Sequence, residues 1–109
     1  MLKGKCKLLK IYITESSKYK SHNLTNVLID KFKEIGMVGV TVTRGIEGYG
    51  QSKSIHTMKV LDLSSSLPII IELVDTVDKI EQAIIIAKEY VNEGLILTTD
   101  VDIIKNGKM

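Results

Sequence analysis

Residues 67–75, LPIIIELVD, decide the fold, because the run is nearly all apolar and is typical of a central strand. Pro68 fits only at the start of such a strand, since proline cannot donate to a strand ladder. The next residues predict a helix capped by Asp75 or Thr76 and ended by Gly94. Its apolar positions recur at three- and four-residue spacing, at Val77, Ile80, Ile84, Ala87 and Val91. Residues 95–104, LILTTDVDII, predict a further strand.

The N-terminal half repeats this order. Residues 7–14, KLLKIYIT, alternate between two faces and predict a strand. An amphipathic helix follows the polar connection at 15–23; Ser21 or Asn23 can cap its start and Gly36 can end it. Its apolar residues are Leu24, Val27, Leu28, Phe32 and Ile35. Alternating valines at residues 38–43 predict the second strand.

The predicted fold is α+β: a ferredoxin-like βαββαβ sandwich with an antiparallel four-stranded sheet. Right-handed connections place both helices on one face of the sheet, with an extended loop or hairpin between strands two and three. At 109 residues, the chain is expected to form a single domain over residues 1–109. The other sheet face is left bare although Ile70 and its neighbours are apolar, so we expect a homo-oligomer.

The composition of the chain argues against several classes of function. A net charge of +2 is too small to predict nucleic-acid binding, and the central strand lacks the aromatics on which RNA-recognition domains stack bases. The single cysteine, Cys6, excludes an internal disulfide, and no apolar run is long enough for membrane insertion. A cytoplasmic location is therefore expected. No nucleophile–base–orienter set is visible, so we do not expect an enzyme.

The long connection at residues 44–66 is the candidate functional stretch. Gly45, Gly48 and Gly50 could let the backbone approach an anion, and the chain's single arginine, Arg44, stands beside them. Gln51, Lys53 and His56 complete the group. The simpler interpretation is that the glycines form a bulged, twisted hairpin where strand two leaves the sheet. A metal site would need His22 and His56 to meet carboxylates in space, and no metal is predicted.

Three segments carry a resemblance to a known family: KLLKIYITES (7–16), GVTVTRGIEGYGQSKSIHT (39–57) and LPIIIELVDTVDKIEQAI (67–84). They closely resemble domain-of-unknown-function family 190, which looks like a relative of the PII signalling proteins. Those are trimers of ferredoxin-like subunits that bind adenine nucleotides in clefts between subunits. Their long loop after strand two contacts a target protein.

The resemblance implies a site at the base of the equivalent loop. It places Gly48, Tyr49, Gly50 and Gln51 beside the nucleotide cleft, with Lys53 further along the loop. Gln51 stands where PII proteins have an arginine, and the glycine-rich loop that wraps PII phosphates is replaced by a short connection at residues 93–95. These departures speak against ATP held in the PII manner and leave a smaller or differently held nucleotide open. Family members are often encoded beside fluoride-channel proteins, which implies a membrane-protein or channel partner.

The sequence therefore predicts a PII-like regulatory homotrimer that binds a small anionic ligand, with an adenine nucleotide as the candidate cofactor. The predicted ligand-binding residues are Arg44, Gly45, Gly48, Tyr49, Gly50, Gln51, Lys53 and His56. Two alternatives stay open. One is a metal- or amino-acid-sensing module; for amino-acid sensing, Gly36 and Gly39 would serve as the effector turn. The other is an acylphosphatase-like hydrolase, which would need an arginine after strand one that residues 15–23 lack.

Overall fold

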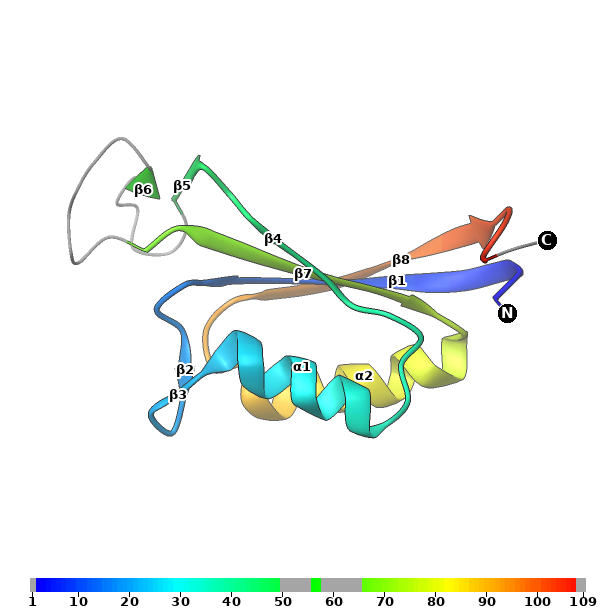
Figure 1. The fold of residues 1–109 in the computed structure, drawn as a ribbon, viewed down its shortest axis with the longest axis horizontal. Helices are drawn as coiled ribbons and strands as arrows, with labels where there is room; N and C mark the ends of the chain where they lie inside the picture. The colour runs from blue at the N-terminus through cyan, green and yellow to red at the C-terminus, as the bar shows by residue number, and fades with distance from the viewer. Residues whose placement is uncertain (1, 50–55, 58–65, 108–109) are drawn as a thin grey trace.

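The computed structural model describes residues 2–49, 56–57 and 66–107 of the chain. Two helices and one four-stranded sheet dominate this part, and two short hairpins accompany them (Figure 1). The elements in chain order are β1 (Gly4–Thr14), β2 (Lys18–Tyr19), β3 (His22–Asn23), α1 (Leu24–Glu34), β4 (Thr41–Arg44), β5 (Glu47–Gly48), β6 (His56–Thr57), β7 (Pro68–Asp75), α2 (Val77–Tyr90) and β8 (Leu95–Ile103).

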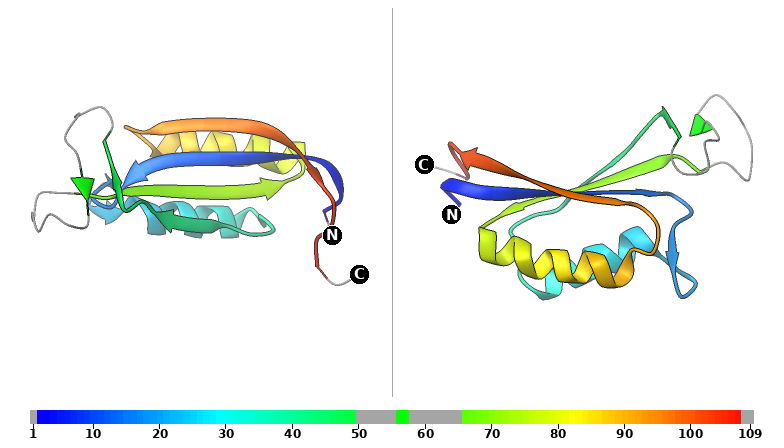
Figure 2. Two further views of the ribbon diagram at one scale, coloured as in Figure 1. Left: turned by 90° about the horizontal axis from the view of Figure 1, so that it is seen from above. Right: turned by 180° about the vertical axis from the view of Figure 1, so that it is seen from behind.

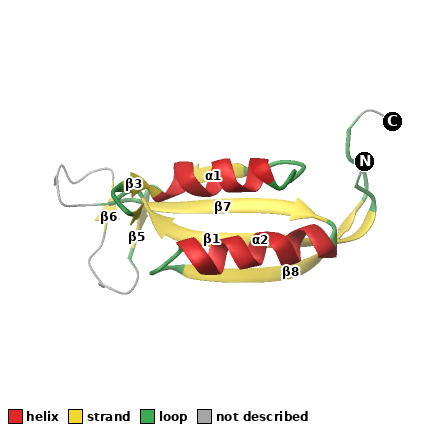
Figure 3. Cartoon of the chain, turned by 90° about the horizontal axis from the view of Figure 1, so that it is seen from below, coloured by secondary structure: helices red, strands yellow, loops and turns green. Residues whose placement is uncertain are grey.

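The main sheet has the strand order β4-β7-β1-β8, and every neighbouring pair is antiparallel. Both helices lie on one face of it, and Figure 3 shows them side by side, running along the strands. The predicted ferredoxin-like βαββαβ fold is confirmed. In this order the first and third main strands, β1 and β7, occupy the centre. The apolar run at residues 67–75 is thus an inner strand, as predicted.

The core forms between the sheet and the helices because each element buries one periodic set of side chains. In β7 the odd-numbered residues Ile69, Ile71 and Leu73 point into it, and β1 does the same with Leu9, Ile11 and Ile13. The helices contribute every third or fourth residue. Their buried residues are Leu24, Leu28, Phe32, Ile80, Ala83 and Ala87. Each large side chain buried in this way contributes roughly 1.5–3 kcal/mol of transfer free energy.

The helix ends follow local capping chemistry. Of the two predicted caps for α1, Asn23 is used: its Oδ1 accepts a hydrogen bond from the Asn26 amide at 3.0 Å. Gly36 follows the helix with a φ of 77°, in the left-handed conformation that was predicted for it. Thr76, not Asp75, caps α2, and its Oγ1 accepts from the Lys79 amide at 3.3 Å.

Three element boundaries and the burial of one helix residue differ from the sequence prediction. The second main strand begins at Thr41 instead of residue 38, because the Val38 amide donates to the Asp75 carboxylate at 3.0 Å and is held away from the ladder. Helix α2 ends at Tyr90 instead of reaching Gly94, and Val77 at its start is 44% exposed instead of buried. The first strand starts earlier, at Gly4, because its pairing with β8 extends that far.

The polar connection after β1 contains a hairpin that the sequence did not predict. Strands β2 and β3 pair antiparallel across Lys20 and Ser21, which have positive φ angles of 49° and 76°. The Tyr19 ring packs edge-on against Tyr90 of α2, with 4.6 Å between ring centroids. The Lys31 ammonium group lies 5.6 Å from the centroid of the Tyr90 ring, and its interactions with Tyr90 and then with Glu34 raise the pKa of Lys31.

No helix covers the sheet face opposite α1 and α2, which we call the bare face (Figure 2). The strand register places the even-numbered residues of β1 and β7 and the odd-numbered residues of β8 on it. Its apolar residues include Leu8, Tyr12, Ile70, Val74, Leu97 and Val101, which are half-buried in the single chain. Lys10 and Glu72 stand opposite each other at its centre. Among the described residues, no helix is long and apolar enough to span a membrane.

Candidate functional site

Backbone pairing holds the chain together at the base of the long loop. We call this base the loop neck; it comprises residues 44–49, 56–57 and 68. The Gly45 amide donates to the Pro68 carbonyl at 2.8 Å, just beyond the last residue of β4. Strand β5 then pairs with β6, which brings the predicted site residues Gly48 and His56 opposite each other. A short antiparallel hairpin therefore stands where the chain leaves the sheet. This is the simpler of the two interpretations that the glycine spacing allowed.

Gly45 and Gly48 are explained by their packing against Pro68. A Cβ atom on Gly45 would lie 2.9 Å from the Pro68 Cγ atom, and one on Gly48 would lie 3.0 Å from the same atom. Neither contact leaves room for a methyl group while the proline ring stays in place. These two glycines therefore have a structural reason to be present, independent of any ligand.

A double-mutant cycle tests this explanation. We expect Gly45→Ala to lower the free energy of unfolding by about 1–2 kcal/mol, because the new methyl group overpacks the neck. In a Pro68→Ala background the same change is expected to cost less than about 0.5 kcal/mol, because the opposing ring atoms are gone. Urea denaturation of the four proteins measures the coupling. Equal costs in both backgrounds would contradict the explanation.

Arg44, the predicted anion-binding residue, is paired with a carboxylate of the chain itself. Its Nη1 donates to Glu15 Oε1 at 2.8 Å, just past the end of β1. Both side chains are partly in solvent, with exposed fractions of 55% for Arg44 and 36% for Glu15. The Arg44 guanidinium is thus accessible to solvent, and it is already paired with one oxyanion, the carboxylate of Glu15.

The other predicted site residues are either exposed or lie outside the residues that the structure describes. Tyr49 is 68% exposed, and its neighbour in the neck, Ile46, is 72% exposed. Two bulky apolar side chains therefore face solvent at the start of the loop. Gly50, Gln51 and Lys53 lie outside the described residues.

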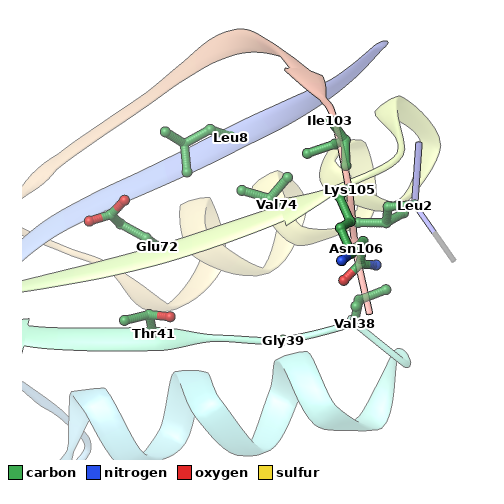
Figure 4. A pocket seen from close by; sticks show the side chains of 10 residues that line it. All are labelled: Leu2, Leu8, Val38, Gly39, Thr41, Glu72, Val74, Ile103, Lys105 and Asn106. Atoms are coloured by element: carbon green, nitrogen blue, oxygen red, sulfur yellow. The ribbon is translucent and has the colours of Figure 1, made fainter. Parts of the chain in front are cut away.

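A pocket of about 360 Å³ lies elsewhere, on the bare face at the start of β4, and the sequence did not predict it (Figure 4). Its lining comes from β1, β4, β7 and the end of β8, together with the segments before β1, before β4 and after β8. Its apolar lining consists of Leu2, Leu8, Val38, Val74 and Ile103. Gly39, Thr41, Glu72, Lys105 and Asn106 supply the remaining lining. The signal in the sequence was weak: Gly39 suggested an effector turn, and Glu72 suggested no more than a carboxylate able to pair with a basic group.

The pocket and the loop neck lie at opposite ends of β4. Thr41, at the start of the strand, is in register with Glu72 and lines the pocket. Arg44, at its end, is in register with Ile69, whose side chain points to the helix face. Because strand residues alternate, Thr41 and Arg44 also point to opposite faces of the sheet. The pocket and the loop neck are therefore separate sites within a single copy of the chain.

Histidines and carboxylates do not converge on a metal-binding arrangement in the part of the chain that the structure describes. His22 belongs to the β2–β3 hairpin and His56 to the β5–β6 hairpin. The two histidines thus lie in separate small sheets.

The fold is similar to that of solved PII-like proteins. The chain is similar to the solved structure of CPII from Thiomonas intermedia K12 bound to ADP and bicarbonate, with a TM-score of 0.63, 16% identity, and coverage of 91% of this chain and 88% of that one. It is equally similar to a putative PII-like signalling protein from Thermus thermophilus, with a TM-score of 0.63, 17% identity, and coverage of 94% and 91%. The fold is therefore the PII-like variant of the ferredoxin-type fold.

Sequence comparison identifies the family of the chain. Residues 6–103 match DUF190, described as "Uncharacterized ACR, COG1993". A UPF0166 protein of Aquifex aeolicus is 38% identical over 100 residues, which cover 92% of this chain and 94% of the relative. A UPF0166 protein of Methanocaldococcus jannaschii is 35% identical over 102 residues, with coverage of 93% and 94%. The chain belongs to the DUF190 (UPF0166) family, as its sequence motifs predicted.

Proposed function

We propose that the protein is a PII-like regulatory module that binds an adenine nucleotide between copies of the chain. One observation carries the proposal: a largely apolar pocket and an accessible arginine lie at opposite ends of β4 in one copy, and we propose that each supplies half of a nucleotide site. In a closed ring, the loop neck of one copy would lie against the pocket of the next. CPII, which shares the fold, was solved with ADP and, in another structure, with ADP and AMP.

The pocket half suits the base of the nucleotide. Apolar side chains line most of it, and the polar lining offers a hydroxyl at Thr41 and a carboxylate at Glu72. A flat heteroaromatic ring can pack between apolar walls while its amino group donates to a carboxylate. The neck half suits the phosphates, because Arg44 supplies an accessible cationic group there. The proposed ligand-binding residues remain those predicted from the sequence: Arg44, Gly45, Gly48, Tyr49, Gly50, Gln51, Lys53 and His56.

The bare face supports assembly. Its apolar side chains would be covered if copies packed these faces together. We propose a homotrimer of single-domain chains, whose interface is this face. The loop between β4 and β7 would then contact a target, for which a membrane protein such as a channel is the candidate partner. In this account the protein acts in the cytoplasm by binding and not by catalysis.

A second candidate follows from the charges in the pocket. Glu72 and Lys105 carry opposite charges on its lining, and together they could match the ammonium and carboxylate groups of a free amino acid. An amino-acid sensor would use the same pocket but would not need the loop neck.

Calorimetric titration separates the two candidates. We expect AMP and ADP to bind, and the Thr41→Val/Glu72→Gln double variant to weaken binding at least tenfold, because it removes the Thr41 hydroxyl and the negative charge of the Glu72 acceptor. Thr98→Val, on the helix-side face of β8, is the matched control and should leave binding unchanged. Amino acids that bind while nucleotides fail at millimolar concentration would support the sensor instead. If neither class binds, the proposal fails.

A further inference from the structure

Glu15 is held in place at the base of the loop by its backbone. The Glu15 amide donates to the Leu67 carbonyl at 2.9 Å, and the Ser17 amide donates to the Thr14 carbonyl at 3.1 Å. The Ser16 amide donates to Ser66 Oγ at 2.8 Å. Three successive amides are thus satisfied without the Glu15 side chain. The carboxylate can leave Arg44 while the turn that carries it stays in place.

The pair between Arg44 and Glu15 is of the kind that an external oxyanion can displace. Both side chains are partly exposed, and ion pairs at such positions contribute only about 0–1 kcal/mol. A guanidinium carries five N–H donors in a planar fork that matches carboxylate and phosphate groups. An incoming phosphate therefore meets an accessible arginine whose present partner is weakly bound.

The ion pair also joins two separate parts of the chain. Glu15 follows β1, whereas Arg44 ends β4, and the two strands are separated in the sheet by β7. The same turn contacts residues 66 and 67 at the far end of the long loop. Displacement of the carboxylate would therefore remove the side-chain tie to β4 and keep the backbone tie to Leu67.

We propose that Glu15 is a built-in competitor that occupies the oxyanion site of Arg44 until a phosphate group displaces it. The proposal deepens the proposed function and rests on Arg44 as an anion-binding residue. It assigns to Glu15 the role of setting how much phosphate is needed to fill the site. The ligand chemistry is a phosphate group, supplied either by free inorganic phosphate or by a nucleotide.

The test is titration of the full-length protein with inorganic phosphate, AMP and adenosine at constant ionic strength. Glu15→Gln removes the competing charge and keeps the shape of the side chain, so phosphate and AMP should bind up to about fivefold more tightly. Arg44→Gln should abolish phosphate binding and weaken AMP. Glu34→Gln is the matched control, because it breaks the surface pair with Lys31 at 3.7 Å and should change neither affinity.

The results of these titrations distinguish failure of the Glu15 role from failure of the proposed nucleotide binding. A purely structural ion pair predicts that Glu15→Gln leaves phosphate and AMP affinity unchanged or reduced, and either result would overturn the role of Glu15. If AMP and adenosine bind in that case, the nucleotide proposal survives alone. If neither binds but Glu15→Gln tightens inorganic phosphate and Arg44→Gln abolishes it, the competitor role stands and the nucleotide proposal fails.

Discussion

Replacement of Gly94 by alanine is expected to lower the free energy of unfolding by about 2–3 kcal/mol. A Cβ atom at this position would lie 2.5 Å from the Tyr12 carbonyl oxygen and 3.1–3.2 Å from side-chain atoms of Val91 and Ile13. The first neighbour is backbone in the central strand β1, which cannot turn aside as a flexible side chain would. The substitution must therefore displace the start of β8 or part of β1.

The matched control is Gly39→Ala. A Cβ atom there has no neighbour within 4 Å, and the φ of Gly39 lies outside the left-handed region. We expect a change within about 0.5 kcal/mol. Chemical denaturation followed by circular dichroism measures both variants. Similar stabilities for the two variants would show that the close approach of Gly94 to Tyr12 does not constrain the fold.

Replacement of Ile70 by aspartate is expected to convert the assembled protein to monomers. Ile70 lies on the bare face, in register with Tyr12 of β1 and Thr43 of β4. Burying a carboxylate against the bare face of a second copy carries a large desolvation cost, whereas in a separate chain the carboxylate is reached by water. Light scattering should give about 36 kDa for the unchanged protein, three times its 12.1 kDa, and about 12 kDa for the variant.

Ile85→Asp is the control for this prediction. Ile85 is 67% exposed on α2, on the opposite side of the molecule from the bare face, and its replacement should leave the mass unchanged. Circular dichroism would verify that both variants are folded. A folded Ile70→Asp protein that keeps the full mass would exclude the bare face as the interface. A 12 kDa mass for the unchanged protein would contradict the assembly itself.

The main elements could be predicted from sequence because one-sided burial imposes a period on each strand and helix. The alternation in 7–14 and the spacing around Phe32 correspond directly to the observed core. Boundaries set by contacts distant in the sequence could not be predicted. The start of β4 depends on the bond from Val38 to Asp75, 37 positions away. Gly94 was predicted as a helix end, but the close approach of Tyr12 is what requires it.

The candidate site was predictable only in part. The glycine spacing marked the loop neck, but the contact of these glycines with Pro68 depends on how the chain returns to β7. The partner of Arg44 could not be identified because Glu15 lies 29 positions away. The pocket was missed because its lining comes from four strands and from the segments around residues 2, 38 and 105, and no local motif joins them. The contribution of Gly50, Gln51 and Lys53 stays a prediction.

Subunit complementation tests most directly the claim that one ligand site is shared between two copies. Arg44→Gln damages the neck half, and Thr41→Val/Glu72→Gln damages the pocket half, so each protein alone should lose high-affinity AMP binding. After the two are unfolded together and refolded as a mixture, random trimers should regain about a quarter of the wild-type number of high-affinity sites, each built from two intact halves. A mixture in which AMP binding remains as weak as in the separate variants would contradict a shared site.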